Sequence, residues 1–133
     1  MSSFQVTAFG HGFDIDGYLA TTRFRPTSRW RRDAGVGDEP RIPKDGFTVE
    51  LGPGTLPLHE QFRVAREFLE DHKPDLARLR GWPGFESACL TVCHAVGPGV
   101  HTFGVFLPAE LVALAGELGW RIGVTTYRST SNT

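Results

Sequence analysis

The sequence predicts an α+β fold: a five-stranded, largely antiparallel or mixed sheet with two main helices and one short helix packed on one face. Three observations predict it. Some segments alternate apolar and polar residues, others carry apolar residues at helical spacing, and the two kinds are interspersed along the chain. The 133 residues, 40% of them hydrophobic, suit one domain with its own core. We expect this domain to span residues 1–128, with a flexible polar tail at 129–133.

Alternation of apolar side chains, or richness in them, marks five segments as strands. They are Phe4–Phe9, Phe47–Leu51, Phe85–Ala95, His101–Leu107 and Trp120–Tyr127. A Gly-Pro-Gly turn at 97–99 separates the third from the fourth, which predicts that these two strands pair as a hairpin.

The helices are predicted from spacing and from the residues at their ends. Leu58–His72 has the strongest helical pattern, and Ala109–Leu118 lies between a proline and a glycine, which favour helix starts and ends respectively. Asp14 is a plausible N-cap for a short helix to about Thr22. A further turn is expected over 75–80, and residues 33–46 are expected to form an exposed loop.

Positive charge is concentrated in one segment. Residues 23–32 read RFRPTSRWRR and hold five arginines with no acidic residue, whereas the whole chain has 14 basic and 15 acidic residues. The other 123 residues therefore carry a net charge of −6. If this segment is extended, alternation places Arg23, Arg25, Arg29 and Arg31 on one side, with Phe24 and Trp30 on the other.

Arginine and tryptophan are frequent in the energetic centres of protein interfaces, and arginine binds carboxylates and phosphates with two parallel hydrogen bonds. We therefore predict that this segment binds an acidic protein partner. The predicted contact residues are Arg25, Arg29, Trp30, Arg31 and Arg32. A small anion is the alternative ligand. A solvated segment whose arginines pair with neighbouring acids is the simplest interpretation, and the pI of about 6.5 disfavours nucleic acid.

A weaker candidate site lies just before the arginines. His11, between two glycines, is followed by Asp14 and Asp16, a combination able to transfer protons on an anionic substrate held by the arginines. Asp14 is more simply a helix cap. This candidate catalytic site is the basis of an alternative function as a small enzyme or ligand-binding protein.

Two cysteines and two histidines raise the question of zinc. On a strand, Cys89 and Cys93 share one face and His94 the other, so these residues do not converge on one ion, although His94 and His101 could meet across the hairpin. The two thiols are about 13 Å apart on a strand and are expected to stay reduced. We expect no metal and no cofactor, and the chain has neither a phosphate-binding glycine loop nor a hydrolase nucleophile motif.

The sequence also bears on location. No apolar run approaches the ~20 residues of a membrane helix, and the first residues lack the features of a signal peptide. We expect a cytoplasmic protein without membrane contact.

Several short motifs agree with one family. They are Phe13-Asp14-Ile15-Asp16, Pro26-Thr27 followed by Trp30-Arg31, Leu107-Pro108-Ala109-Glu110-Leu111, and a last strand that closes at Tyr127. In these motifs the chain resembles the small bacterial proteins grouped as "domain of unknown function 4279". The resemblance implies a bacterial origin and a shared fold but supplies no catalytic residues. Some small bacterial domains of this general kind are immunity or partner-binding proteins, so we favour a non-enzymatic, immunity-like binding protein.

Overall fold

One five-stranded sheet runs through the molecule in the order β2-β3-β1-β4-β5. The computed structural model describes residues 2–31, 44–100 and 104–128. The strands are β1 (Ser2–Gly10), β2 (Ser28–Trp30), β3 (Asp45–Glu50), β4 (Ser87–Val96) and β5 (Arg121–Arg128).

The sheet is mixed. β1 lies at its centre and pairs antiparallel with β3 and β4, so that Val6 stands opposite Val49 on one side and Leu90 on the other. β2 pairs antiparallel with β3, whereas β4 and β5 are parallel. A parallel pair needs a crossover connection, and the helix between β4 and β5 supplies it.

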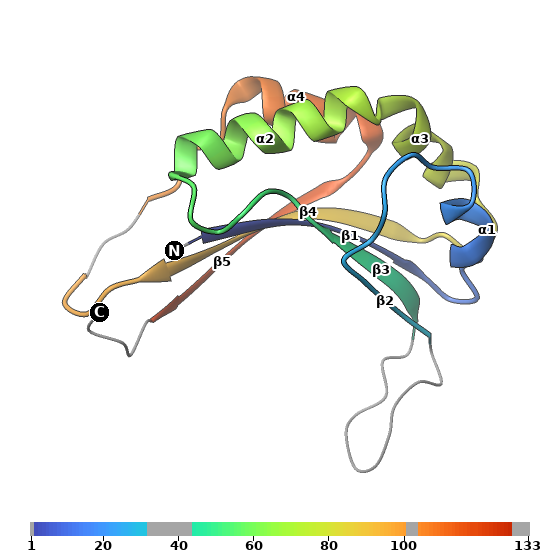
Figure 1. Ribbon diagram of the computed structural model, residues 1–133, viewed down its shortest axis with the longest axis horizontal. Coiled ribbons are helices and arrows are strands. Elements are labelled where there is room, and N and C mark those ends of the chain that lie inside the picture. The colour runs from blue at the N-terminus through green and yellow to red at the C-terminus, as the bar shows by residue number, and fades with distance from the viewer. Residues whose placement is uncertain (1, 32–43, 101–103, 129–133) are drawn as a thin grey trace, which may run out of the picture.

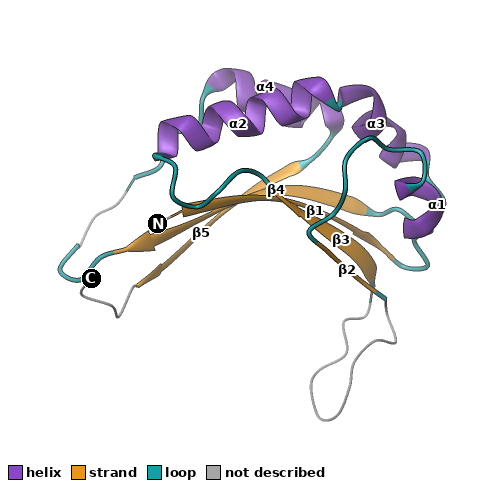
Figure 2. Ribbon diagram, viewed as in Figure 1, coloured by secondary structure: helices purple, strands orange, loops and turns teal. Residues whose placement is uncertain are grey.

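The helices cover one face of the sheet, as Figures 1 and 2 show. They are α1 (Ile15–Leu19), α2 (Leu58–Asp71), α3 (Lys73–Ala77) and α4 (Ala109–Leu118), with a 3-10 turn η1 (Arg78–Gly81) after α3. No helix among the described residues is long and apolar enough to cross a membrane.

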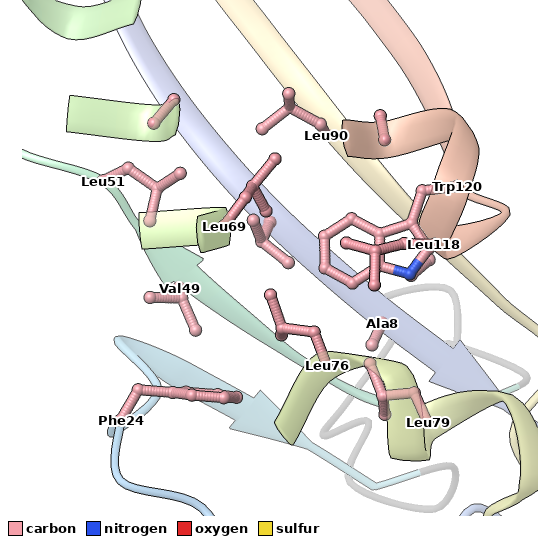
Figure 3. Close-up of a cluster of buried hydrophobic side chains, with 14 of the residues drawn as sticks. Ala8, Phe24, Val49, Leu51, Leu69, Leu76, Leu79, Leu90, Leu118 and Trp120 are labelled. Atoms are coloured by element: carbon pink, nitrogen blue, oxygen red, sulfur yellow. The ribbon is translucent and has the colours of Figure 1, made fainter. Parts of the chain in front are cut away.

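The hydrophobic core fills the space between this helical layer and the sheet (Figure 3). Every second residue of the central strands points into it, for example Val6 of β1 and Leu90 of β4, both fully buried. Leu69 of α2 and Leu76 of α3 meet them from above and are also buried. Alternation along the strands and helical spacing in α2 thus produce two apolar surfaces that pack together.

The predicted α+β class, with one sheet and helices on one face, is confirmed, and the two longest helices lie close to their expected positions. Two details of the strands differ. Residues 104–107 of the predicted strand His101–Leu107 form no strand, while residues 101–103 lie outside the described part of the chain. The physical reason is that β1 and β5 occupy both sides of β4, which leaves no edge for a hairpin partner.

The second difference is β2, a short strand within the arginine segment that the sequence did not single out. The expected loop over 33–46 is partly wrong, because Asp45 and Gly46 begin β3, and its residues 33–43 lie outside the described residues. The expected tail at 129–133 also lies outside them.

Candidate functional site

The arginine segment leaves α1, crosses the helical side of the sheet and ends as its edge strand β2 (Figure 1). Phe24 anchors it. The residue is 6% exposed. The centroid of its ring lies 5.5 Å from that of Phe68 and 6.2 Å from that of Phe47. Burial of this ring fixes the segment against the core, so the arginines that follow are held on an ordered backbone.

The prediction that Phe24 and Trp30 share one side is wrong. Trp30 stands opposite Gly46 in β3, and a Cβ on that glycine would lie only 2.6 Å from Cζ2 of the indole. The indole therefore lies over Gly46 on the open face of the sheet, opposite the core side that Phe24 and Phe47 occupy. The segment is extended only over Ser28–Trp30, so alternation does not carry back to residue 24.

Asp16 of α1 holds two of the predicted contact residues. Its Oδ1 accepts a hydrogen bond of 2.9 Å from Nη1 of Arg29, and its Oδ2 pairs with Nη2 of Arg31. The arginine side chains remain 61% and 66% exposed. Two guanidinium groups thus share one carboxylate, which leaves one unit of positive charge and places both groups in defined positions.

Arg25 has no carboxylate partner among the described residues. Its Nη1 lies 3.4 Å from the carbonyl oxygen of Phe24 and 3.5 Å from that of Thr22, at the limit of hydrogen bonding. The residue lines an open groove of about 740 Å³ between α1 and the start of β2. We call this the arginine groove; its lining residues are Asp16, Leu19, Ala20, Arg25, Pro26, Thr27, Ser28 and Arg29.

A smaller hollow of about 260 Å³ adjoins the arginine groove and is lined in part by Asp16, Trp30 and Arg31. The structure therefore brings Arg25, Arg29 and Arg31 together at the β2 edge of the sheet, whereas the indole of Trp30 lies on the opposite face. Arg32, the fifth predicted contact residue, lies outside the described residues.

Arg23 has a structural role instead. Its backbone N–H donates to Oδ2 of Asp75 at 3.1 Å, and its Nη2 donates to the carbonyl oxygen of Asp71 at 2.6 Å. The other carboxylate oxygen of Asp75, Oδ1, forms an ion pair with Nη2 of Arg78 at 3.0 Å. The Tyr18 hydroxyl donates a hydrogen bond to the backbone carbonyl oxygen of Asp75 at 2.8 Å. This network ties the chain after α1 to α3.

Burial alone would raise the pKa of Asp75, but the Arg23 amide and the guanidinium groups of Arg78 and Arg23 outweigh it and hold the pKa below its ordinary value. Burial raises the pKa of Tyr18, which therefore stays protonated. Sequence reasoning missed Asp75: Arg78 is only three residues away, but Arg23 and Tyr18 are 52 and 57 residues away along the chain.

The candidate catalytic residues do not form one site. Asp14 caps α1, as predicted, by accepting the Gly17 N–H at 3.1 Å, and Asp16 is engaged by two arginines. His11 lines neither hollow beside the arginines. The pKa of Glu86 is lowered mainly by its hydrogen bond with Lys44. A hydrogen bond from the His11 backbone and the charge of His11 lower it further.

The sulfur-bearing residues are also separate. Cys89 and Cys93 are free thiols on the open face of the sheet, and Sγ of Cys89 lies 3.4 Å from Oγ1 of Thr91. His94 falls on the opposite side of β4, where burial lowers its pKa. Within the described residues, no three His, Cys, Asp or Glu side chains are grouped to hold a metal ion. His101 lies outside the described part of the chain.

No protein-family model, curated protein or solved structure gives a significant match to this chain. The geometry of the arginine groove is therefore the basis on which a function can be inferred.

Proposed function

We propose that this chain is a non-enzymatic binding protein that recognises an acidic surface of a partner protein through the arginine groove. The observation that carries the proposal is the pairing scheme: Arg29 and Arg31 share the single carboxylate of Asp16, and Arg25 has no carboxylate partner among the described residues. The groove and its rim thus present about two unbalanced positive charges on side chains whose backbone is anchored by Phe24.

Exposure favours a protein over a small anion. The side chains of Arg29 and Arg31 are more than 60% exposed, so water screens their attraction for a free ion. A protein surface that covers the groove would exclude that water and strengthen each guanidinium–carboxylate contact. Trp30 lies between Arg29 and Arg31 along the chain, but its indole points to the open face of the sheet and so lies outside the surface that the two guanidinium groups present.

We propose that the protein acts in the bacterial cytoplasm. Its role there resembles that of an immunity protein, which binds one partner. Free cysteines on a surface of the sheet suit a reducing compartment. The resemblance to "domain of unknown function 4279" supports the bacterial origin.

A matched pair of double variants tests the proposal. Arg25→Ala/Arg29→Ala removes two charges from the groove, and Arg63→Ala/Arg66→Ala removes two from the exposed side of α2, where both arginines pair with glutamates. Tagged wild type and both variants are used to capture proteins from a lysate of the source cells, and the captured protein is then purified and titrated by calorimetry.

We expect the groove variant to lose affinity by about tenfold or more, and the α2 variant to bind as wild type does. Wild-type affinity should fall as salt is added, and the groove variant should depend less on salt. Equal binding by both variants, or capture of no protein, would contradict the proposal. Stabilisation of the wild type by citrate or phosphate, lost in the groove variant, would instead support a small anionic ligand.

A further inference from the structure

The two edges of the sheet are unequal. β2 has three residues and follows Pro26, so it offers a short template for further pairing. β5 has eight residues, bonds β4 along one side over its full length, and pairs with no strand on its other side among the described residues. Figure 1 shows β5 as the outermost strand at its edge.

Apart from an arginine at each end, β5 also lacks the features that usually protect an edge strand. Its sequence RIGVTTYR contains no proline and no lysine, and its register with β4 continues without a bulge from 121 to 128. Most of it is exposed, including two large side chains, Val124 at 47% and Tyr127 at 51%. An edge of this length, with apolar side chains on both faces, is suited to accept another strand.

We propose that a second copy of this chain occupies this edge, with the two β5 strands antiparallel and a two-fold axis at Thr125. The pleat restricts the register. A two-fold axis perpendicular to the sheet pairs residues that share a face, so it passes through a residue and not between Val124 and Thr125. An axis at Thr125 places Arg128 opposite Ile122, which belongs to the same face.

The same register gives the aromatic side chain a partner. Tyr127 of each copy stands opposite Gly123 of the other, and both residues belong to the open face of the sheet. Among the described residues, a Cβ at Gly123 would meet within 4 Å only Sγ of Cys89 and Oγ1 of Thr91, at 3.6 and 3.8 Å, so space remains there for the phenol ring. Aromatic packing over a cross-strand glycine is a known way to stabilise a sheet. An axis at Val124 would place Tyr127 opposite Arg121 instead.

Antiparallel pairing across a two-fold axis perpendicular to the sheet keeps the helices of both copies on the same face. The product is a continuous ten-stranded sheet in which no β5 edge remains. This proposal is independent of the proposed function, because the arginine groove lies at the other end of the strand order.

The first test is sedimentation velocity of the full chain over about a hundredfold range of concentration. We expect wild type to associate to a dimer and Val124→Lys, which places a charge on the edge, to remain monomeric. The control is Val112→Lys on α4, where the valine has nearly the same exposure of 45%, and this variant should dimerise as wild type does. Circular dichroism confirms that each variant is folded.

Cross-linking then tests the register in a Cys89→Ser/Cys93→Ser background. Thr125→Cys should form a disulfide with its symmetry mate faster than Val124→Cys, because residue 125 stands opposite itself and residue 124 lies diagonal to itself. Preferential cross-linking of Val124→Cys would overturn the register. A wild type that stays monomeric throughout, or a dimer that Val124→Lys leaves intact, would overturn the proposal and leave the edge to a strand from another protein.

Discussion

Two aspartates, Asp16 and Asp75, each bind two arginines, yet their surroundings differ. The Asp16 side chain is 52% exposed, whereas that of Asp75 is 10% exposed and also accepts the Arg23 backbone N–H. Exposed ion pairs contribute little because water screens them, while a buried carboxylate depends on its partners. At the scale of single residues, one aspartate therefore positions a surface and the other holds the fold together.

Substitution of each aspartate by asparagine should separate these roles. We expect Asp75→Asn to lower the free energy of unfolding by about 2 kcal/mol, since charge-assisted hydrogen bonds are lost in a buried place. Asp16→Asn should lower it by less than about 1 kcal/mol. Urea unfolding followed by circular dichroism measures both, and equal losses would show that burial does not distinguish the two sites.

The low pKa of Asp75 predicts how stability depends on pH. The folded-state pKa lies below that of the unfolded chain, about 3.9, so the unfolded state binds more protons in the interval between them. The contribution of Asp75 to stability is complete above that interval and is lost as the pH falls through the folded-state pKa. Urea unfolding between neutral pH and pH about 2.5 should show a larger acid loss in wild type than in Asp75→Asn, and parallel curves would refute this assignment.

At the scale of elements, a close backbone contact connects the end of β1 to the turn before β4. Gly84 has φ of +81°, and a Cβ there would lie 2.3 Å from the carbonyl oxygen of Gly12. A Cβ on Gly10 would in turn lie 1.8 Å from the carbonyl oxygen of Gly84. Both the conformation and the space thus require glycine, and this contact sets where β1 ends and the chain enters α1.

Gly84→Ala should destabilise the protein by about 2 kcal/mol or more, because the left-handed backbone and the overlap with Gly12 both disfavour a side chain. Gly81→Ala is the matched control: it lies three residues earlier, in η1, where a Cβ would meet open space. Its effect should stay within about 0.5 kcal/mol. Thermal unfolding of both variants measures the difference, and similar melting temperatures would contradict the argument.

Elements with a strong internal pattern could be predicted from the sequence, and those defined by pairing could not. The spacing of apolar residues placed α2 within a residue of its ends, and alternation located β1, β3, β4 and β5. The strand β2 has only three residues and exists because β3 is beside it. The error at 104–107 arose because a Gly-Pro-Gly turn suggests a hairpin, whereas the parallel crossover through α4 depends on distant contacts.

The candidate site shows the same division. The arginine-rich segment is evident in the sequence, but which arginines remain available depends on Asp16 and Asp75, which belong to other elements. For the whole molecule, the net charge of −1 conceals a local excess near Arg25. A count of charges identified the segment, and only the fold separated Arg23 from the arginines of the groove.

At the scale of the whole molecule, the two proposed interaction surfaces should act independently. β2 and β5 lie at opposite edges with three strands between them, a separation at which substitutions usually have additive effects. Val124→Lys should keep the affinity of each groove for the partner, and Arg25→Ala/Arg29→Ala should keep the dimer. Calorimetry and sedimentation of the two variants test this, and a change in both properties from either variant would indicate coupling between the edges.

The strand order β2-β3-β1-β4-β5 has a consequence for valency. Joining two copies at β5 leaves the two β2 strands at the outer edges of one ten-stranded sheet. Nine interstrand spacings of about 4.8 Å separate them, which is about 43 Å across the sheet. A partner with two acidic sites that far apart would engage both grooves at once and gain avidity from the high effective concentration of the second site. A partner whose two sites are closer together would bridge separate dimers, and dimers and partner molecules would then alternate in long polymers.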